Sequence, residues 1–348
     1  MGDRTGKRVV VVGAGIVGAS LAYHLARKGA QVTLVEAAEL ASGVTARSFA
    51  WINTAHAGND PIARLRGAAI EDYRRLEAEL PELQIRWSGA LSWGTGAEDE
   101  PSSPTWLSRA EILEREPNLR HPPRQASYNA EEGALDAVQT TRALVVGAQA
   151  HGATVFTQTR VSGFTFSGAD VTGIETTAGP LAADVIVLAA GTGTVQLAEM
   201  LDVSLPIDAS PAIFIRFKTQ PDRLNGIISS SEMEVRQNAD GTLLAAEDYL
   251  GNAPHNQPDE IARRTAQVIQ HELHGVTSIE LQSACVGLRP VPVDGVPVVG
   301  YLPTVGGVYV CAMHPGVTLA AIVGRLASEE IVSGIASVDL GNCRPGRF

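Results

Sequence analysis

A glycine-rich segment near the start of the chain has the spacing of a dinucleotide-binding turn. Gly13, Gly15 and Gly18 form a G-x-G-x-x-G pattern, and Glu36 follows eighteen residues after the last glycine. The first glycine permits a tight turn, the second lets the backbone approach a pyrophosphate, and the third allows a helix to pack closely on a sheet. Glu36 can accept hydrogen bonds from ribose hydroxyls. The pattern indicates FAD or NAD, and a glycine-rich turn without a ligand is the alternative.

The surrounding sequence supplies the elements that this pattern requires. Residues 8–12 are mostly valines, as expected of a strand that is buried on both faces. A helix over residues 16–28 and a second apolar strand over residues 32–35 complete a βαβ unit. In the first turn of that helix, Ile16 and Val17 offer N–H groups and the positive end of the helix dipole to an anion.

The composition is that of a globular protein with an acidic surface. Hydrophobic residues make up 45% of the 348 residues and charged residues 19%, which supports a large core and argues against disorder. The formal net charge is −11. Nucleic acid and membrane surfaces are therefore not expected as partners, because their negative charges repel an acidic surface. Any bound anion must be held locally, by backbone N–H groups and a few arginines.

The cysteines and the first apolar run favour a reducing, cytoplasmic location. The three cysteines, Cys285, Cys311 and Cys343, have no motif spacing, so neither a disulfide framework nor a metal site is expected. Glycines, and then the charged Arg27 and Lys28, interrupt the first apolar run before it is long enough to span a membrane. We expect no transmembrane segment elsewhere.

The rest of the chain alternates expected helices and strands with one irregular stretch. Asp60 and Pro61 are expected to open a helix, and Thr140 to cap another. Between them, the proline-containing stretch from Trp87 to Pro123 is expected to be irregular. Further strands are expected at 153–157, 171–176, 184–188 and 211–219, a hairpin at 233–246, and helices at 141–151, 258–274 and 315–334.

Several segments, in order along the whole chain, are similar to those of the D-amino-acid oxidase and glycine/sarcosine oxidase family. Residues 41–50 resemble the small-residue loop that follows the ribose-binding glutamate there, and residues 187–191 resemble the family's second FAD signature. Residues 314–320 match the start of its flavin-facing helix. The remaining similar segments are residues 133–136, 287–290 and 294–300 and the closing Arg347-Phe348.

This resemblance implies FAD rather than NAD, and it implies which residues bind it. In the family, the loop after the glutamate lies along the diphosphate, and a backbone position matching Val161 contacts the adenine. For Arg47, an ordinary solvent-facing arginine is the alternative. The implied FAD-binding residues are Gly13, Gly15, Ile16, Val17, Gly18, Glu36, Ala37, Ser42, Thr45, Ala46, Arg47, Ser48, Val161, Ala190, Gly191, Arg289, Pro315, Gly316, Val317 and Thr318.

The resemblance also implies a reaction. In this family a hydride leaves a carbon next to nitrogen and goes to flavin N5, and the resulting imine hydrolyses in water. The expected activity is that of an FAD-dependent oxidase or dehydrogenase acting on a small amino acid or N-alkyl amino acid. Free N–H groups of Gly316, Val317 and Thr318 are expected to stabilise negative charge on the reduced flavin. A flavin-binding protein without catalytic activity is the alternative.

Arg289 is the expected substrate-binding residue. The matching arginine of relatives grips the substrate carboxylate, which a guanidinium fits with two charge-assisted hydrogen bonds. The alternative is a structural arginine paired with Asp294. His314 either faces the flavin or substrate, or caps a helix. Other candidate residues of the catalytic pocket, for which surface or core roles are the alternative, are Tyr249, His56, Glu247 and Asp248, with Arg216 as another carboxylate anchor.

Two features differ from the sarcosine-oxidising relatives. Those relatives carry a lysine that assists the reaction with oxygen, but this chain has only Lys7, Lys28 and Lys218, none of them near residues 244–247. The electron acceptor is therefore O2 or another acceptor, including a partner protein in a hetero-oligomeric dehydrogenase. Relatives also attach flavin through a cysteine. Cys285 lies in that neighbourhood, but its spacing to Asp294 favours a buried structural thiol, so FAD is expected to bind non-covalently.

The expected fold is α/β, with two interleaved domains. A Rossmann-like FAD-binding domain is expected to combine residues 1–80, 132–202 and 285–348. A smaller α+β substrate domain with an antiparallel sheet is expected to take residues 81–131 and 203–284. The sequence leaves the substrate's side chain, its stereochemistry and homo-oligomer formation open.

Overall fold

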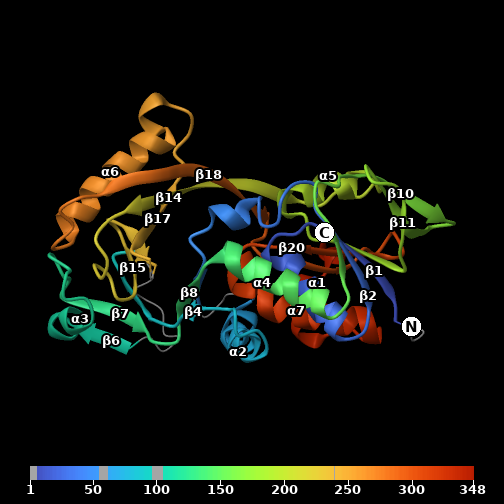
Figure 1. Cartoon of the computed structure of the whole chain (residues 1–348), viewed down its shortest axis with the longest axis horizontal. Coiled ribbons are helices and arrows are strands. Elements are labelled where there is room, and N and C mark those ends of the chain that lie inside the picture. Colours follow the sequence, from blue (N-terminus) through green and yellow to red (C-terminus); the bar gives the residue numbers. More distant parts are fainter. Residues whose placement is uncertain (1–5, 55–61, 96–104, 239) are drawn as a thin grey trace.

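Two large β-sheets, one mainly parallel and one mainly antiparallel, organise the chain. The computed structural model describes residues 6–54, 62–95, 105–238 and 240–348. Figure 1 shows the parallel sheet with its helices on the right and the antiparallel sheet on the left. The prediction of an α/β fold that combines a Rossmann-like part with an antiparallel sheet is confirmed.

The parallel sheet is the expected buried one. Its strand order is β19-β20-β13-β1-β2-β9, and only β19 pairs antiparallel with its neighbour. Val9 to Val12 are at most 6% exposed, as a strand covered on both faces requires. The strands are β1 (Arg8–Val12), β2 (Gln31–Val35), β9 (Thr154–Phe156), β13 (Val185–Leu188), β19 (Val298–Tyr301) and β20 (Val308–Ala312).

Alternate valines of the central strand enter two different cores. Val9 and Val11 pack against long helices on one face, whereas Val10 and Val12 pack against a small sheet and a short helix on the other. The helices of the first face are α1 (Ile16–Arg27), α4 (Ala137–Ala150) and α7 (Gly316–Ser333). The elements of the second are β10 (Val161–Ser167), β11 (Asp170–Thr176), β12 (Leu181–Ala182) and α5 (Thr194–Glu199).

The second sheet has eight strands in the order β18-β14-β17-β16-β15-β5-β7-β6. All neighbouring pairs are antiparallel except β15 with β5. Its apolar side packs against two helices, α3 (Arg109–Arg115) and α6 (Pro258–Glu272). The strands are β5 (Ala90–Trp93), β6 (Thr105–Ser108), β7 (Gln125–Asn129), β14 (Ile207–Lys218), β15 (Ile227–Ser230), β16 (Glu234–Gln237), β17 (Thr242–Asp248) and β18 (Glu280–Pro292).

The two long strands β14 and β18 connect the sheets. They extend from the antiparallel sheet toward the parallel one (Figure 1). At Gly287 a Cβ atom would lie 2.9 Å from the carbonyl oxygen of Arg47, so β18 approaches the loop after β2 very closely. The remaining elements are α2 (Ala63–Glu79), the small sheet of β3 (Trp51–Ile52), β8 (Gly133–Leu135) and β4 (Ile85–Arg86), and short 3-10 turns at Val44–Arg47, Gly191–Gly193, Pro254–Asn256, Val338–Cys343 and Pro345–Arg347.

Two predictions of local structure are wrong. The stretch from Trp87 to Pro123 is not irregular, because it contains β5, β6 and α3. A capping box starts α3, in which the Ser108 hydroxyl accepts from the Glu111 N–H and the Glu111 carboxylate accepts from the Ser108 N–H. The helix predicted to follow Thr140 begins one turn earlier, because the Asp136 carboxylate caps it by accepting from the N–H groups two and three residues later.

Two further expectations are not decided by the fold. Asp60 and Pro61, expected to open a helix, lie outside the described residues, and α2 begins at Ala63. The two domains with their residue boundaries stay a prediction.

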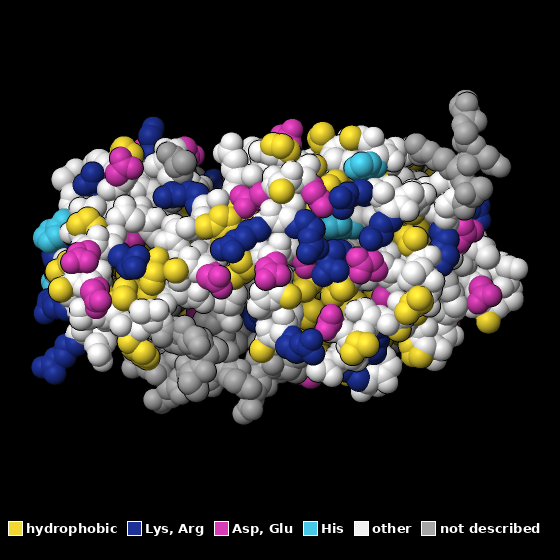
Figure 2. Space-filling view, turned by 90° about the horizontal axis from the view of Figure 1, so that it is seen from below, with side chains coloured by type: hydrophobic (Ala, Val, Ile, Leu, Met, Phe, Trp, Pro, Cys, Tyr) yellow, Lys and Arg dark blue, Asp and Glu magenta, His cyan; other side chains and the backbone are white. Residues whose placement is uncertain are grey.

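Among the described helices, none has the length and apolar character of a membrane span. On the face shown in Figure 2, basic and acidic side chains are interspersed.

Candidate active site

A cavity of about 690 Å³ is lined by both sheets. The carboxyl ends of β1, β2, β13 and β20 contribute the turns that follow them, as expected of a ligand site in an open α/β sheet. The antiparallel sheet contributes side chains from β14, β16, β17 and β18. Most of the residues predicted to bind FAD line this cavity.

The glycine turn after β1 has the shape that its sequence predicts. Gly13 has a φ of +104°, and a Cβ atom there would lie 2.5 Å from the carbonyl oxygen of Ala189. Gly15 lines the cavity and leaves it open to a ligand. Gly18 is not a lining residue, because it packs behind the turn, where a Cβ atom would lie 1.9 Å from the Gly13 carbonyl oxygen.

Glu36 at the end of β2 presents its carboxylate to the cavity. Its two oxygens accept hydrogen bonds from the N–H groups of Ala14 (2.8 Å) and Ala38 (2.9 Å). These bonds fix the carboxylate beside the glycine turn and leave further lone pairs for the hydroxyls of a ribose. Thr159 and Arg160, which the sequence did not single out, line the cavity beside the predicted Val161.

The loop after β2 closes the cavity near the N-terminus of α1. The Thr45 hydroxyl accepts a hydrogen bond from the Ile16 N–H at 3.2 Å, which ties the loop to the first turn of the helix. The lining residues of this region are Ile16, Val17, Ala37, Ser42, Thr45, Arg47 and Ser48. Ala46 is not among them, since it lines a much smaller adjoining cavity together with Arg216.

The start of α7 forms another wall of the cavity. Pro315, Gly316, Val317 and Thr318 line it, and no side chain of the described residues caps this helix N-terminus. The Thr318 hydroxyl donates to the carbonyl oxygen of Trp51 at 3.1 Å, which fixes the first turn of the helix. The N–H groups of this turn are therefore positioned toward the cavity, together with the positive end of the helix dipole. Ala190, Gly191 and His314 also line the cavity.

Arg289 lines the cavity from β18. Its Nη2 donates to the Ser210 hydroxyl at 3.1 Å and lies 3.4 Å from the Pro211 carbonyl oxygen, while Nε is buried without a partner among the described residues. Asp294 instead pairs with Arg347 at 2.8 Å. The alternative of a structural Arg289–Asp294 pair is therefore wrong, and Arg289, a lining residue, keeps hydrogen-bonding capacity that no described residue uses.

Glu234 of β16 is a lining residue that was not predicted from the sequence. Burial raises the pKa of its carboxyl group to about 7, and the nearby negative charges of Glu247 and Asp248 add to this effect, while Arg289 opposes it. Its carboxylate makes no hydrogen bond or ion pair to any described side chain. A partly buried carboxyl group with a pKa near neutrality is a frequent mark of functional sites.

The other candidate pocket residues lie elsewhere. The Tyr249 hydroxyl donates to the Asn252 side chain, Glu247 accepts a 2.7 Å hydrogen bond from Thr265, and Asp248 is exposed; none of the three lines the cavity. Tyr249 was expected beside the substrate, but it packs with the core beneath α6. Arg216 lines the smaller cavity. His56 lies outside the described residues.

Two further residues reach the cavity without having been predicted. Arg66 of α2 is only 6% exposed and lines it, as does Asn53, whose buried Oδ1 has no partner among the described residues. The sequence did contain an indication that Arg66 is buried. It lies four positions from both Ile62 and Ile70, on the apolar face of an amphipathic helix, where a charged residue is unusual. Cys285 does not line the cavity, and its Sγ lies 3.7 Å from the Phe214 carbonyl oxygen.

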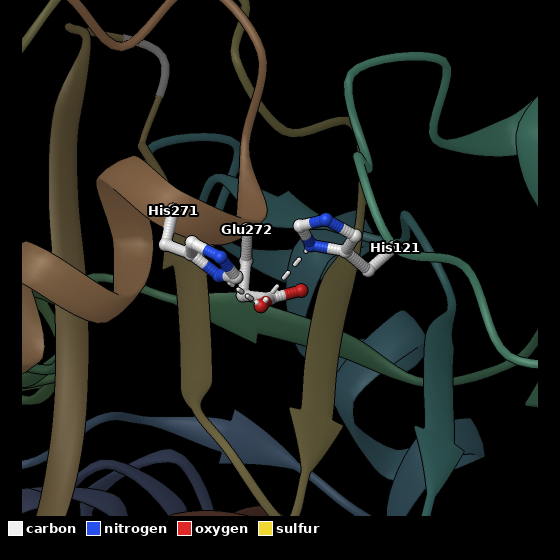
Figure 3. Close-up of side chains that lie close together, drawn as sticks. All are labelled: His121, His271 and Glu272. Atoms are coloured by element: carbon white, nitrogen blue, oxygen red, sulfur yellow. Dashed lines mark hydrogen bonds and ion pairs between the residues drawn. The ribbon is translucent and has the colours of Figure 1, made fainter.

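A separate cluster of possible metal ligands lies at the end of α6. His121, His271 and Glu272 place one ligand atom each within 4.8 Å of one another (Figure 3). The Nδ1 atoms of the two histidines lie 3.4 Å and 2.8 Å from the same Glu272 oxygen, and the two rings stack. The shared carboxylate therefore accounts for the arrangement by itself. None of the three residues lines the cavity.

Comparisons with known proteins place this site in context. The family model described as "FAD dependent oxidoreductase" (DAO) matches residues 8–330. The chain is 25% identical to a glycine oxidase of Pseudomonas putida over 96% of each chain, and 23% identical to a subunit of the opine oxidase of Rhizobium meliloti over 98% of this chain and 97% of the relative. The fold is similar to that of L-proline dehydrogenase from P. horikoshii, with a TM-score of 0.87 at 20% identity over 99% and 98% of the two chains.

Proposed function

This chain belongs to the family of FAD-dependent oxidoreductases. We propose that FAD binds non-covalently in the large cavity, and that the enzyme oxidises the C–N bond of a small amino acid or N-alkyl amino acid there. The family comprises FAD-dependent amino-acid oxidases and dehydrogenases, and its cofactor is FAD.

The cavity residues fit FAD. The N-termini of α1 and α7 both line the cavity; Thr45 bonds the Ile16 N–H of α1, and the next N–H groups of α1 and those of α7 make two sites for negatively charged groups. Arg289 Nε and Asn53 Oδ1 are buried on its wall without partners among the described residues. Buried polar atoms are nearly always hydrogen-bonded in folded proteins, so these two atoms support a polar ligand that supplies the missing bonds.

We assign the parts of FAD to the walls of the cavity as follows. The Glu36 carboxylate would accept hydrogen bonds from the ribose, and the N–H groups at the start of α1 would hold the diphosphate together with the loop around Thr45. The adenine would lie near Val161. The flavin ring would lie against the start of α7, between the parallel sheet and Arg289.

The chain's own residues would bind and orient the substrate and would stabilise negative charge on the flavin ring. When bound, FAD supplies the acceptor for a hydride that leaves the carbon next to the substrate's nitrogen. Arg289 would hold the substrate carboxylate, which fixes the position of that carbon. The N–H groups of Gly316, Val317 and Thr318 would stabilise the negative charge that develops on the ring. The imine product then hydrolyses in water without an acyl nucleophile or a metal ion.

One observation carries this proposal: Arg289 and the N-terminus of α7 line the same cavity. The former would hold the substrate and the latter the electron acceptor, so the two partners of the reaction would meet there. A glycine oxidase and an opine oxidase component among the relatives, and an L-proline dehydrogenase of similar fold, are named for small carboxylated amines. They support the same class of substrate for this chain.

Anaerobic reduction of the flavin tests the proposal. Purified protein loaded with FAD is mixed without oxygen with glycine, sarcosine, both enantiomers of proline and alanine, and an opine, and the visible flavin absorption is followed. We expect at least one carboxylated amine to bleach the flavin, while amines without a carboxylate do not. Failure of the whole panel to reduce a fully loaded protein would contradict the substrate class.

The electron acceptor is a second point on which the structure supports a choice. No lysine is among the residues that line the cavity in the described part of the chain, so the oxygen-assisting lysine of sarcosine-oxidising relatives has no counterpart there. We propose that electrons pass to an acceptor other than O2, such as a partner protein in a complex. One relative is named as a subunit of an opine oxidase, which supports a partner of this kind. Faster reoxidation of the isolated chain by an artificial acceptor than by air is the expected result. Equal rates would count against it.

Non-covalent attachment has its own readout. Cys285 does not line the cavity, and its thiol lies next to the Phe214 carbonyl group instead. Acid precipitation of the loaded protein should therefore release all of the flavin into the supernatant. Yellow colour that stays in the precipitate would contradict this assignment.

A further inference from the structure

One basic and one acidic side chain line the cavity without being paired with each other. Arg289 comes from β18 and Glu234 from β16, and both line the cavity. The positive charge of Arg289 influences the ionisation of Glu234, so the two groups lie within electrostatic range, yet they form no ion pair in the described structure. When Glu234 is ionised, the two groups are complementary to a ligand that carries both charges itself.

The register of the antiparallel sheet places both side chains on the same face. Glu234 lies directly opposite Ala246, and Ala246 lies directly opposite Phe214. Residues directly opposite each other point to the same side of a sheet. Arg289 lies opposite Ser210, which is four residues before Phe214 and so shares its side. Ala246 and Phe214, which also line the cavity, lie on this face between the strands of the two charged groups.

From this arrangement we infer that Glu234 binds the amino group of the substrate while Arg289 binds its carboxylate, so that the cavity selects zwitterions over simple carboxylic acids. The inference rests on the proposed function, because it assigns Arg289 to the carboxylate. It adds a residue that determines specificity. An ammonium group would offer the Glu234 carboxylate the hydrogen-bond donors that it lacks in the described structure.

The charged groups around Glu234 define how its role depends on pH. Glu247 and Asp248 of β17 disfavour its ionised form, and Arg289 of β18 favours it. A bound ammonium group adds a positive charge and favours the ionised carboxylate, whereas a ligand with only a carboxylate favours the protonated form. Zwitterions should therefore bind better above neutral pH, and simple carboxylates better below it.

Matched ligand pairs separate charge from shape. Glycine and propanoate, sarcosine and butanoate, and L-proline and cyclopentanecarboxylate have nearly the same shape and differ in whether they carry the ammonium. We would measure their binding by calorimetry to holoenzyme whose flavin has been chemically reduced, which prevents turnover. At pH 8 the zwitterion of a pair should bind the wild-type protein at least about tenfold more tightly, the effect of one charge-assisted hydrogen bond.

The Glu234→Gln variant should reverse this preference. It should weaken binding of the zwitterion about tenfold or more and strengthen binding of the matched carboxylate, and it should abolish the opposite pH dependences between pH 6 and 8. Glu234→Asp keeps the charge and should restore part of the preference. Glu232→Gln, which removes the same charge from an exposed position two residues away, should behave as the wild type. Flavin content and thermal unfolding establish that each variant is folded.

The outcomes are distinguishable from failure of the proposed function. If zwitterion and carboxylate bind equally and Glu234→Gln changes neither, the role of Glu234 is wrong while the carboxylate site stands. The same holds if only the simple carboxylates bind. If neither member of any pair binds the folded, FAD-loaded wild type, the proposed substrate class is wrong and the role of Glu234 is wrong with it.

Discussion

On one side of the cavity the ends of the parallel strands present turns and helix N-termini, whereas on the other side the antiparallel sheet presents side chains from four strands. The first side consists mainly of backbone, with Gly13, Gly15 and the start of α7 as its main parts. The second depends on side chains such as Arg289 and Glu234. The difference separates the parts that bind the cofactor from the parts that can change with the substrate. Cofactor binding relies on local backbone geometry, and substrate choice relies on side chains that the sheet brings together.

The largest effect is expected from a side chain placed in the glycine turn. Gly13→Ala would put a methyl group 2.5 Å from the Ala189 carbonyl oxygen at a φ of +104°. We expect loss of FAD binding and a loss of stability of about 3 kcal/mol or more. Flavin content and thermal unfolding measure the two effects. The control is Gly67→Ala in α2, which has no atom within 4 Å of the added methyl group and should keep the flavin. A fully yellow, stable Gly13→Ala protein would contradict the assigned role of the turn.

Removal of the guanidinium on the substrate side should affect catalysis without affecting the cofactor. For Arg289→Ala we expect kcat/KM for the best carboxylated amine to fall about 100-fold, because two charge-assisted hydrogen bonds are lost. Flavin content should change little. Arg263→Ala, which removes an exposed arginine of α6, is the control. An Arg289→Ala enzyme with unchanged kcat/KM would show that the carboxylate is held elsewhere.

Glu234 should make the stability of the FAD-free protein depend on pH. Its pKa is raised from the ordinary 4.5 to about 7, so its protonated form is favoured in the folded state. The associated stability is present below pH 4.5 and is lost as the pH rises through 7. Glu234→Gln should therefore be more stable than the wild type at pH 8, by up to about 3 kcal/mol, and similar to it at about pH 4.5. Urea unfolding at the two pH values measures the difference. An advantage of the variant that does not depend on pH would point to a packing effect instead.

The smallest effect is expected from the residue behind Glu234. Glu247 is held by Thr265, and its negative charge raises the pKa of Glu234. Glu247→Gln should lower that pKa by less than about one unit, so the pH at which propanoate binding weakens should move downward. The same titration on the Glu232→Gln variant gives the reference. An unchanged midpoint would show that the two carboxyl groups are not coupled.

The backbone side of the site could be predicted from the sequence because its signals are local. The spacing of Gly13, Gly15 and Gly18 and the position of Glu36 all act within one βαβ unit. The start of α7 at Pro315 was equally visible. The errors in this part concern helix caps. The capping Asp136 precedes the predicted Thr140 by one turn, and both are good capping residues, so the sequence alone did not decide between them.

The wall of the cavity that the antiparallel sheet forms with side chains could be predicted only where the family resemblance pointed to it. Arg289 was found in this way, whereas Glu234 was missed because its position in the cavity depends on pairing between β16, β17 and β14. Tyr249 was placed wrongly for the same reason, since it lies just past the end of β17 and packs with the core beneath α6. Which residues of a sheet share a face with a distant strand is set by register, and one sequence does not reveal that register.

The most direct test of the account is a crystal structure of the FAD-loaded protein with cyclopentanecarboxylate or a zwitterion of the same shape bound. We predict that the flavin ring lies between the start of α7 and Arg289, with the ligand's carboxylate on the guanidinium. A flavin ring that lies away from Arg289, or a cavity that does not take up FAD, would contradict the claim that the two sheets build one active site.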